Sequence, residues 1–308
     1  MTPFLLDDAQ HFVRAPDWTW YILGYFFFAG LTGGSYFLAS LFRLFGKDVD
    51  EPAARLGYYV AFVALLPCPV LLTLDLGQPL RFYHMLFEFK WWSPMSVGAW
   101  AITVFGAMAT VSFVEVLARD GKLGFMRWVA RLLDGFLGKL WALVGALLGV
   151  FIAGYTGVLL SVSNQPVWSD TWALGGLFLA SGLSGSAALM GWLVRFRHDA
   201  EPTTTALGLS ERWFQLLELA LIGVFGYTLL QMGAFERAFG YPWVLLWAVV
   251  AVGLIGGLTY RSARPGRPAP GPDGTLATTR VHTATLTVML VLLGIIALRA
   301  AVIFSAQI

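Results

Sequence analysis

Residues Leu74 to Gly98 read LDLGQPLRFYHMLFEFKWWSPMSVG and hold a cluster of charged and polar side chains. The sequence before them (AFVALLPCPVLLTL, residues 61–74) and after them (AWAITVFGAMATV, residues 99–111) is strongly apolar. Charged side chains are costly inside a bilayer unless they are paired or functional, and here they fall between two apolar segments. The stretch therefore predicts two transmembrane helices joined by a short polar connection, which is the first place to look for function.

The composition is that of an integral membrane protein. Hydrophobic residues make up 58% of the 308 residues and charged residues 12%, against about a quarter charged in soluble domains. The 13 tryptophans and 24 phenylalanines are typical of lipid-facing helices with aromatic belts at the membrane surfaces. The net charge is only +2 and no basic patch is interleaved with aromatics. The expected surroundings are membrane lipid, with no nucleic-acid partner.

Eight segments are long and apolar enough to cross a bilayer, which takes about 20 residues. They are Trp18–Phe45, Ala54–Leu76, Pro94–Ala118, Lys139–Ser161, Thr171–Val194, Arg212–Met232, Pro242–Tyr260 and His282–Phe304. We therefore expect an all-α membrane protein with eight transmembrane helices in two four-helix bundles, residues 18–162 and 171–304. Residues 261–281 are rich in Pro and Gly and predict an exposed loop.

The two halves of the sequence contain a weak internal repeat, which we call the echo. GLTGGSYFLASLFRLF begins at Gly30, and GLSGSAALMGWLVRF begins at Gly182. Four spans separate the two phrases, so the halves would be related in a parallel rather than an inverted way. Glycines at these positions suit a close approach between helices. Chance recurrence is the alternative in a sequence that has 34 glycines.

Lysine and arginine set the expected orientation, because they are enriched in cytoplasmic loops. The loops after the first, third, fifth and seventh spans hold fifteen of them, and the opposite side holds five. Both termini, including the N-terminal segment 1–17, and the Asp75–Trp92 connection are therefore expected on the periplasmic side of a bacterial inner membrane. The loop 261–281 is expected in the cytoplasm.

Cysteine and histidine are too few or too scattered for a metal centre. Cys68 is the single cysteine, so this protein cannot hold an iron–sulfur cluster by itself. The four histidines are His11, His84, His198 and His282, and no two share a depth in the membrane as a bis-histidine haem requires. We expect no metal site, no haem and no iron–sulfur cluster in this protein.

Polar side chains are expected at one depth in the outer half of the membrane. Tyr25 lies about 10 Å from the outer surface, at 1.5 Å per residue along the first span, and Tyr155 lies at a similar level in the fourth span. A quinone head-group needs hydrogen-bond donors to its carbonyls, an acid–base group and a carboxylate that relays protons. The candidate quinone-binding residues are Tyr25, Tyr155, Gln78, Arg299 and Tyr227, and the candidate catalytic residues are Asp75, Arg81 and His84.

These residues also have plain structural interpretations. Tyr25 and Tyr155 fit interfacial aromatics whose hydroxyls are hydrated. Arg81 fits a structural salt bridge with Asp75. Arg299 fits a side chain that extends to lipid phosphate.

Two carboxylates lie nearer the cytoplasm, Glu218 in LLELALIG and Glu115 in VSFVEVLA. An ionised carboxylate at membrane depth costs on the order of 3 kcal/mol even on insertion scales. Both residues are candidates for a proton path. The alternatives are a neutral hydrogen bond to a facing helix for Glu218 and an interfacial position for Glu115.

The signature phrases resemble those of a known family of membrane subunits. DLGQPLRFYHML (75–86) followed by SPMSVGAW (93–100) is similar to the pattern D-L-G-x-P-x-R-F/W and S-P-M-S-x-G of NrfD/PsrC-type (polysulfide reductase-like) subunits. The GLTGG phrase of the first span and YTGVLLS (155–161) also look like that family. The resemblance covers essentially the whole sequence.

The resemblance implies a subunit of a larger oxidoreductase that is not catalytic alone. Such subunits bind menaquinone or ubiquinone near the outer face, carry no metal, and work with a ferredoxin-like iron–sulfur subunit. A molybdopterin subunit or a multihaem cytochrome often completes the complex. Tyr155 matches the family's quinone-contacting tyrosine, and Asp75 and Arg81 match its signature loop. Some relatives place a histidine and an asparagine in the first span, where this sequence has Tyr25 and Ile22.

Three functions remain open from the sequence. The first is a quinone-reactive electron-transfer subunit, and the second is a membrane anchor or proton-path subunit without redox chemistry of its own. The third is a secondary transporter, which the two-bundle echo and the intramembrane Glu218 would suit. Transporters usually place their polar ligands near the midplane on broken helices, whereas polar residues here concentrate at the outer rim, which favours the first function.

Overall fold

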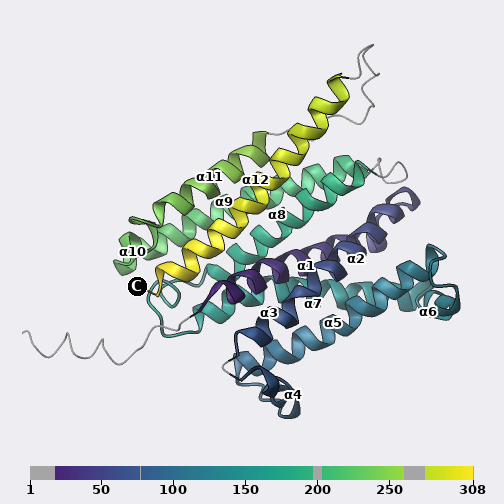
Figure 1. The fold of residues 1–308 in the computed structure, drawn as a ribbon, viewed down its shortest axis with the longest axis horizontal. Helices are drawn as coiled ribbons and strands as arrows, with labels where there is room; N and C mark the ends of the chain where they lie inside the picture. The colour runs from purple at the N-terminus through teal and green to yellow at the C-terminus, as the bar shows by residue number, and fades with distance from the viewer. Residues whose placement is uncertain (1–17, 77, 197–202, 260–274, 308) are drawn as a thin grey trace, which may run out of the picture.

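The computed structural model describes residues 18–76, 78–196, 203–259 and 275–307, and all secondary structure within these ranges is helical (Figure 1). The predicted N-terminal segment 1–17 lies outside the described residues, as does most of the predicted loop 261–281. The expectation of an all-helical protein is confirmed for the described part.

Seven segments among the described residues are long and apolar enough to cross a membrane. They are α1 (Trp20–Phe45), the segment Asp48–Leu74 that contains α2 (Glu51–Leu65) and α3 (Pro67–Leu74), α5 (Pro94–Arg119), α7 (Gly135–Ser161), α8 (Leu174–Val194), α9 (Thr204–Met232) and His282–Ser305 within α12 (Thr275–Ser305). The protein is therefore a multi-pass membrane protein.

Three predicted boundaries differ clearly from the structure. α9 begins at Thr204, eight residues before the predicted start at Arg212. The predicted span Pro242–Tyr260 corresponds to α11 (Val244–Thr259), whose 16 residues extend about 24 Å, less than the roughly 30 Å hydrocarbon core. α12 begins at Thr275, inside the predicted loop 261–281. Gly274 is the last helix breaker of that loop, and no Pro or Gly follows until Gly294.

Short helices join the long ones at the two ends of the molecule. They are α4 (His84–Phe87), α6 (Arg127–Leu132), α10 (Phe235–Phe239) and the 3-10 turns η3 (Asp48–Asp50), η4 (Pro79–Arg81) and η5 (Gly124–Met126). α4 and α10 lie at one end of the molecule and α6 at the opposite end (Figure 1).

Two prolines interrupt the second span. α2 ends at Leu65 and α3 begins at Pro67, because Pro67 and Pro69 have no backbone N–H to continue the helical bonding pattern. Cys68 lies between them, fully buried, and its Sγ is 3.5 Å from the Ala64 carbonyl oxygen. Both α2 and α3 pack against α1, so the second span follows α1 on either side of the break.

α1 lies at the centre of the molecule. It packs against α2, α3 and α7 on one side and against α8 and α12 on the other (Figure 1). α5 packs against α2 and α7. α9 packs against α8 and α11, and α11 packs against α12. The outer half of α1 is therefore the place where side chains from both halves of the sequence can meet.

The echoed glycines form the contact between the two halves. A Cβ added at Gly182 would lie 3.0 Å from both the Cα and the carbonyl oxygen of Gly30. One turn further along, a Cβ at Gly34 would lie 2.5 Å from Ser186 Oγ, and that hydroxyl donates to the Leu31 carbonyl at 3.1 Å. The predicted close approach of these helices is confirmed, and it depends on the missing side chains.

This contact yields a first prediction about stability. Gly182→Val should destabilise the protein by about 1–3 kcal/mol, the usual cost of overpacking, because the new side chain meets the backbone of α1. The measurement is thermal unfolding of the purified protein in detergent. Gly223→Val is the matched control, since a Cβ at Gly223 meets nothing within 4 Å. Equal unfolding temperatures for the two variants would contradict the prediction.

Candidate functional site

Tyr25 and Tyr155 lie together in the interior beside α3 and α5. Their exposed fractions are 4% and 8%, and Tyr25 is close enough to Tyr155 and Cys68 to interact with both electrostatically. The Tyr155 hydroxyl donates to the Pro94 carbonyl at 2.6 Å, and no described residue hydrogen-bonds the Tyr25 hydroxyl. Their rings are therefore buried inside the protein, whereas interfacial aromatics lie at the membrane surface.

The start of α5 is shaped to receive Tyr155. Ser93 caps the helix by accepting from the Ser96 N–H at 3.4 Å, and Pro94 occupies the first turn, where a missing N–H costs nothing. Any side chain at Gly98 would collide with the Tyr155 ring. The SPMSVG phrase therefore forms the surface against which the Tyr155 ring packs.

Asp75 lies one residue beyond the span Asp48–Leu74, at the C-terminal cap of α3. Burial raises the pKa of the Asp75 carboxyl above its usual value, and a hydrogen bond with Thr19 lowers it to a smaller extent. Thr19 is the N-terminal cap of α1. Asp75 thus joins the ends of α1 and α3, near the same end of α1 as Tyr25.

The other polar residues of the signature loop face away from the protein interior. Gln78, Arg81 and His84 are all exposed, and His84 Nδ1 lies 3.1 Å from the Arg81 carbonyl oxygen. The ion pairs of the described residues do not include one between Asp75 and Arg81. The structural salt bridge considered for this pair does not form, and the Arg81 side chain stays on the surface.

An apolar groove of about 440 Å³ opens between α2–α3 and α5. Leu66, Pro69 and Leu72 line it on one side, and Ile102 and Gly106 line it on the other. Phe82 and Leu86 of the signature connection also line it. The groove therefore runs along the same two elements that lie beside Tyr25 and Tyr155.

Arg299 is buried at the junction of the two halves, with an exposed fraction of 0%. Its Nε donates to the Phe26 carbonyl at 3.3 Å, its Nη1 to Ser181 Oγ at 2.9 Å, and its Nη2 to the Phe178 carbonyl at 3.3 Å. The guanidinium carbon also lies 5.1 Å from the centre of the Phe178 ring. This position excludes extension to lipid phosphate, and it places Arg299 beside the residue that follows Tyr25.

Glu218 continues the buried polar network. It is 2% exposed and accepts a hydrogen bond from Ser184 Oγ at 2.8 Å. Ser184 Oγ also lies 3.0 Å from the Ser181 carbonyl oxygen. Polar groups thus run from Glu218 on α9, through two serines of α8, to Arg299 on α12.

Tyr227 lies apart from these groups. It is 61% exposed on α9, and its hydroxyl accepts a hydrogen bond from Gln231 Nε2 at 2.7 Å. The equal depth of Tyr227 and Tyr155 along their helices does not bring them together, because the Tyr227 side chain points outward and the Tyr155 side chain points inward.

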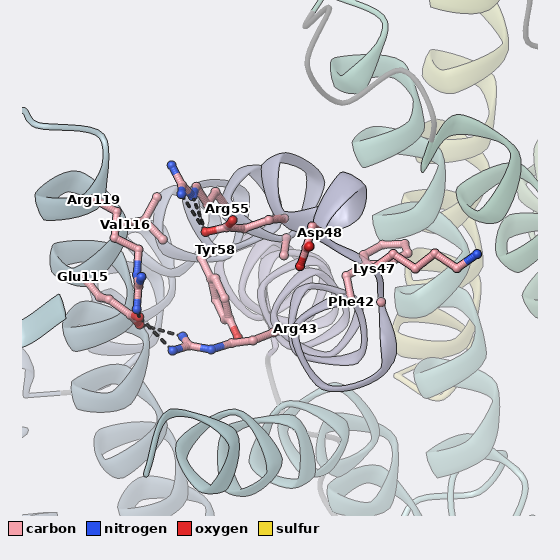
Figure 2. A pocket seen from close by; sticks show the side chains of 12 residues that line it. Phe42, Arg43, Lys47, Asp48, Arg55, Tyr58, Glu115, Val116 and Arg119 are labelled. Atoms are coloured by element: carbon pink, nitrogen blue, oxygen red, sulfur yellow. Dashed lines mark hydrogen bonds and ion pairs between the residues drawn. The ribbon is translucent and has the colours of Figure 1, made fainter. Parts of the chain in front are cut away.

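Glu115 is held by two arginines at the end of the molecule near α6. Its carboxylate accepts from Arg43 Nη1 and Nη2 at 2.7 and 2.8 Å and from Arg119 Nη2 at 3.0 Å. Figure 2 shows the Arg43 side chain reaching across from α1 to the Glu115 carboxylate, beside a charged cavity of about 220 Å³. Glu115 is 1% exposed and lies one turn before the end of α5 at Arg119, so it is a buried, paired carboxylate near that end of the helix.

Sequence reasoning missed four polar residues near the site. Thr19 caps α1 and bonds Asp75. Ser181 directly precedes the GLSGS phrase and Ser184 lies within it, but only the glycines of that phrase were interpreted, as packing residues. Gln215 lies one turn before Glu218 with an exposed fraction of 0%, and neither of its side-chain polar atoms has a hydrogen-bond partner among the described residues. The spacing of three residues, between the two serines and again between Gln215 and Glu218, was the available signal.

Metal-ligating side chains do not gather in the part of the sequence that the structure describes. No group of three or more His, Cys, Asp or Glu side chains lies close enough there to hold a metal ion. The polar groups that do cluster are hydroxyls, one guanidinium and carboxylates. Such groups can donate and accept hydrogen bonds and move protons.

Fold and site together define a class: a multi-pass helical membrane protein with buried polar groups between its two halves. The family profile described as "Polysulphide reductase, NrfD" matches residues 8–265. The protein therefore belongs to the NrfD (polysulphide reductase) family. This is the family that the signature phrases predicted.

The individual relatives share only low sequence identity with this protein. Protein NrfD of Escherichia coli is 26% identical over 211 residues, covering 64% of this sequence and 65% of the relative. A polysulfide reductase chain from Wolinella succinogenes is 28% identical over 174 residues, covering 54% and 55%. A selenate reductase subunit from Mesobacillus selenatarsenatis is 31% identical over 86 residues, covering 28% and 20%. The match thus spans less than two thirds of the length of each of these relatives.

The buried arginine gives a second prediction. Arg299→Met should lower stability by about 3–5 kcal/mol, because it leaves buried acceptors and Glu218 without their cation. The measurement is thermal unfolding in detergent, together with the yield of folded protein from membranes. Arg237→Met is the control, since Arg237 is exposed on α10. Arg299→Met that unfolds at the same temperature as the control would refute a structural role for Arg299.

Proposed function

We propose that this protein is the quinone-interacting membrane subunit of a multi-subunit oxidoreductase. It would exchange electrons between the membrane quinone pool and an iron–sulfur partner subunit on the periplasmic side. The observation that carries the proposal is the buried Tyr25–Tyr155 pair, in which one hydroxyl has no described partner. The helices α3 and α5 next to this pair also border an apolar groove, which neither tyrosine lines. Family membership supports the same function, because the relatives include a part of a polysulfide reductase.

The chemistry of a quinone suits this arrangement. The head-group carries two carbonyl oxygens that accept hydrogen bonds, and the isoprenoid tail is apolar. The Tyr25 hydroxyl would donate to one carbonyl, and Tyr155 would do so by exchanging its bond to the Pro94 carbonyl. The groove between α2–α3 and α5 would hold part of the tail. Menaquinone and ubiquinone share these features, and both fit the proposal.

Proton movement accompanies quinone chemistry, since a quinol releases two protons for two electrons. Asp75 is the proposed relay on the outer side, because it lies at the end of α3 close to the surface and bonds the cap of α1. The exposed connection between α3 and α5 holds the other candidates. Arg81 and His84 are proposed as catalytic residues there, and Gln78 is proposed to bind the quinone.

The inner part of a proton path is proposed to start at Glu218 and its serine-linked connection to Arg299. Glu115 was the other candidate for this path. The two arginines on its carboxylate support a different role, which is to hold α1 to α5.

An electron-carrying partner would dock over the signature connection. Leu80, Phe87 and Trp91 there are 88%, 77% and 74% exposed, a surface suited to a protein contact at the membrane edge. A ferredoxin-like iron–sulfur subunit is the proposed partner, with a molybdopterin or multihaem cytochrome subunit beyond it. The excess of Lys and Arg at the α6 end supports a cytoplasmic location for that end and a periplasmic location for α4. In this proposed topology α11 is the eighth span, and both termini lie on the periplasmic side.

Tyr155→Phe and Tyr25→Phe should each reduce quinol-linked turnover by about threefold to tenfold while the complex still assembles, since each removes one hydrogen bond worth roughly 1 kcal/mol. Turnover is measured on the purified complex with a soluble quinol analogue. Tyr241→Phe is the matched control, because Tyr241 is 85% exposed.

The same experiment separates this proposal from the membrane-anchor alternative. Normal turnover of an assembled complex carrying both tyrosine substitutions would favour an anchor without redox chemistry. The subunits that co-purify provide the second readout, and an iron–sulfur protein among them is the expected result.

Asp75→Asn should slow turnover more than it weakens quinone binding, because it removes the relay and preserves the shape. Burial raises the pKa of Asp75, so the carboxyl takes up a proton at a higher pH than an exposed aspartate does. Turnover should therefore fall on the acid side at a pH above the usual value of about 3.9. The rate measured against pH should lose this acid limb in the variant. Loss of the assembled complex would instead assign Asp75 a structural role.

A further inference from the structure

A second apolar groove lies at the opposite end of the molecule, between α5, α6 and α7. Its volume is about 460 Å³, and Val114, Val129, Leu133 and Trp141 are among its lining residues. Thr110 also lines it, but its hydroxyl donates to the Gly106 carbonyl of its own helix at 2.7 Å. Trp141 Nε1 donates to Ser112 Oγ at 3.0 Å. The polar side chains among the lining residues are therefore already bonded, and the groove suits a hydrocarbon tail.

Large aromatic side chains surround this groove at the level of α6. Phe125, Trp128 and Phe136 are 74%, 59% and 82% exposed. Exposed aromatics next to a transmembrane helix end are typical of the interfacial layer of a membrane. The groove thus opens where acyl chains meet head-groups.

Positive charge beside the groove lacks a counter-ion among the described residues. Arg127 and Arg131 are exposed, and no ion pair or hydrogen bond joins their side chains to other residues of the described ranges. The two acidic residues in the segment between α5 and α7, Asp120 and Asp134, already form ion pairs with other residues. Asp120 binds Arg55 at 2.9 Å, and Asp134 binds Arg119 at 2.6 Å.

α6 separates the apolar and the basic side chains. Trp128, Val129, Leu132 and Leu133 line the groove, whereas Arg127 and Arg131 lie one turn apart on the other face of the helix, by the helical period of 3.6 residues. An amphipathic helix of this kind lies in the membrane surface with its basic face among the head-groups. Long arginine stems can then extend to a phosphate at that level.

We propose that the groove between α5, α6 and α7 binds an anionic phospholipid. One acyl tail would lie against Val129 and Trp141, and the phosphate would pair with Arg127 and Arg131. The combination of an apolar groove and uncompensated cations selects an amphiphile with net negative charge. A zwitterionic lipid would fill the groove with an acyl tail but would bring no net negative charge to the arginines. A free phosphate ion would bring the charge but would leave the groove empty. Thr110 lines both grooves, but none of the residues proposed for the quinone chemistry lines this one.

The test is lipid binding to the full-length protein in detergent, followed by native mass spectrometry during titration with phosphatidylglycerol or phosphatidylcholine. We expect phosphatidylglycerol to bind more tightly than phosphatidylcholine of the same acyl length. The double variant Arg127→Gln/Arg131→Gln should reduce phosphatidylglycerol affinity by roughly tenfold. The control, Lys47→Gln/Arg212→Gln, makes the same charge change at exposed positions elsewhere and should leave that affinity within about twofold.

A second variant tests the groove without changing charge. Val114→Trp should fill the groove and reduce phosphatidylglycerol affinity by a similar factor. A loss of affinity in the charge variant but not in Val114→Trp would overturn the proposal, because it would show attraction to a basic surface without a seated acyl tail. Equal binding of the two lipids, or equal losses in the charge variant and its control, would also overturn it.

Discussion

The structure depends on one buried cation. Arg299 places a guanidinium with no exposed surface between α1, α8 and α12, where an unpaired charge would be prohibitively costly. Backbone carbonyls, a serine hydroxyl and an aromatic face surround it, and the serines of α8 connect it to the buried Glu218 carboxyl. Because these acceptors come from several helices, the charge is stable only when both halves of the protein are assembled. The arginine thereby couples the position of α1 to the second half.

Small residues make that assembly possible. A Cβ at Gly30 would lie 2.6 Å from Arg299 Nη2 and 3.3 Å from the Cα of Gly182. The same glycine therefore provides space for the guanidinium and for the neighbouring helix. Van der Waals packing and interhelical hydrogen bonds must hold helices together in lipid, where the hydrophobic effect between helices is absent. The position of Tyr25, between one and two turns from Gly30 on α1, follows from this packing.

The candidate site illustrates which residues could be predicted. Tyr25, Tyr155 and Asp75 were expected at one depth, and the structure brings them to neighbouring elements because α3 and α7 both pack against α1. Tyr227 shares that depth but faces outward, since depth follows from position along a helix whereas direction follows from rotation about its axis. Thr19 and Ser184 were missed because a single hydroxyl in an apolar helix is equally common where it only bonds its own backbone.

Local composition and short phrases were enough to predict the class of fold, most helix ends and the family. The internal position of Arg299, the two arginines on Glu115 and the surface position of Arg81 became visible only in the packed structure. The physical reason is that the state of a charged side chain in a membrane depends on which partners the neighbouring helices present. For Arg299, the partners on α8 lie more than a hundred residues away in the sequence.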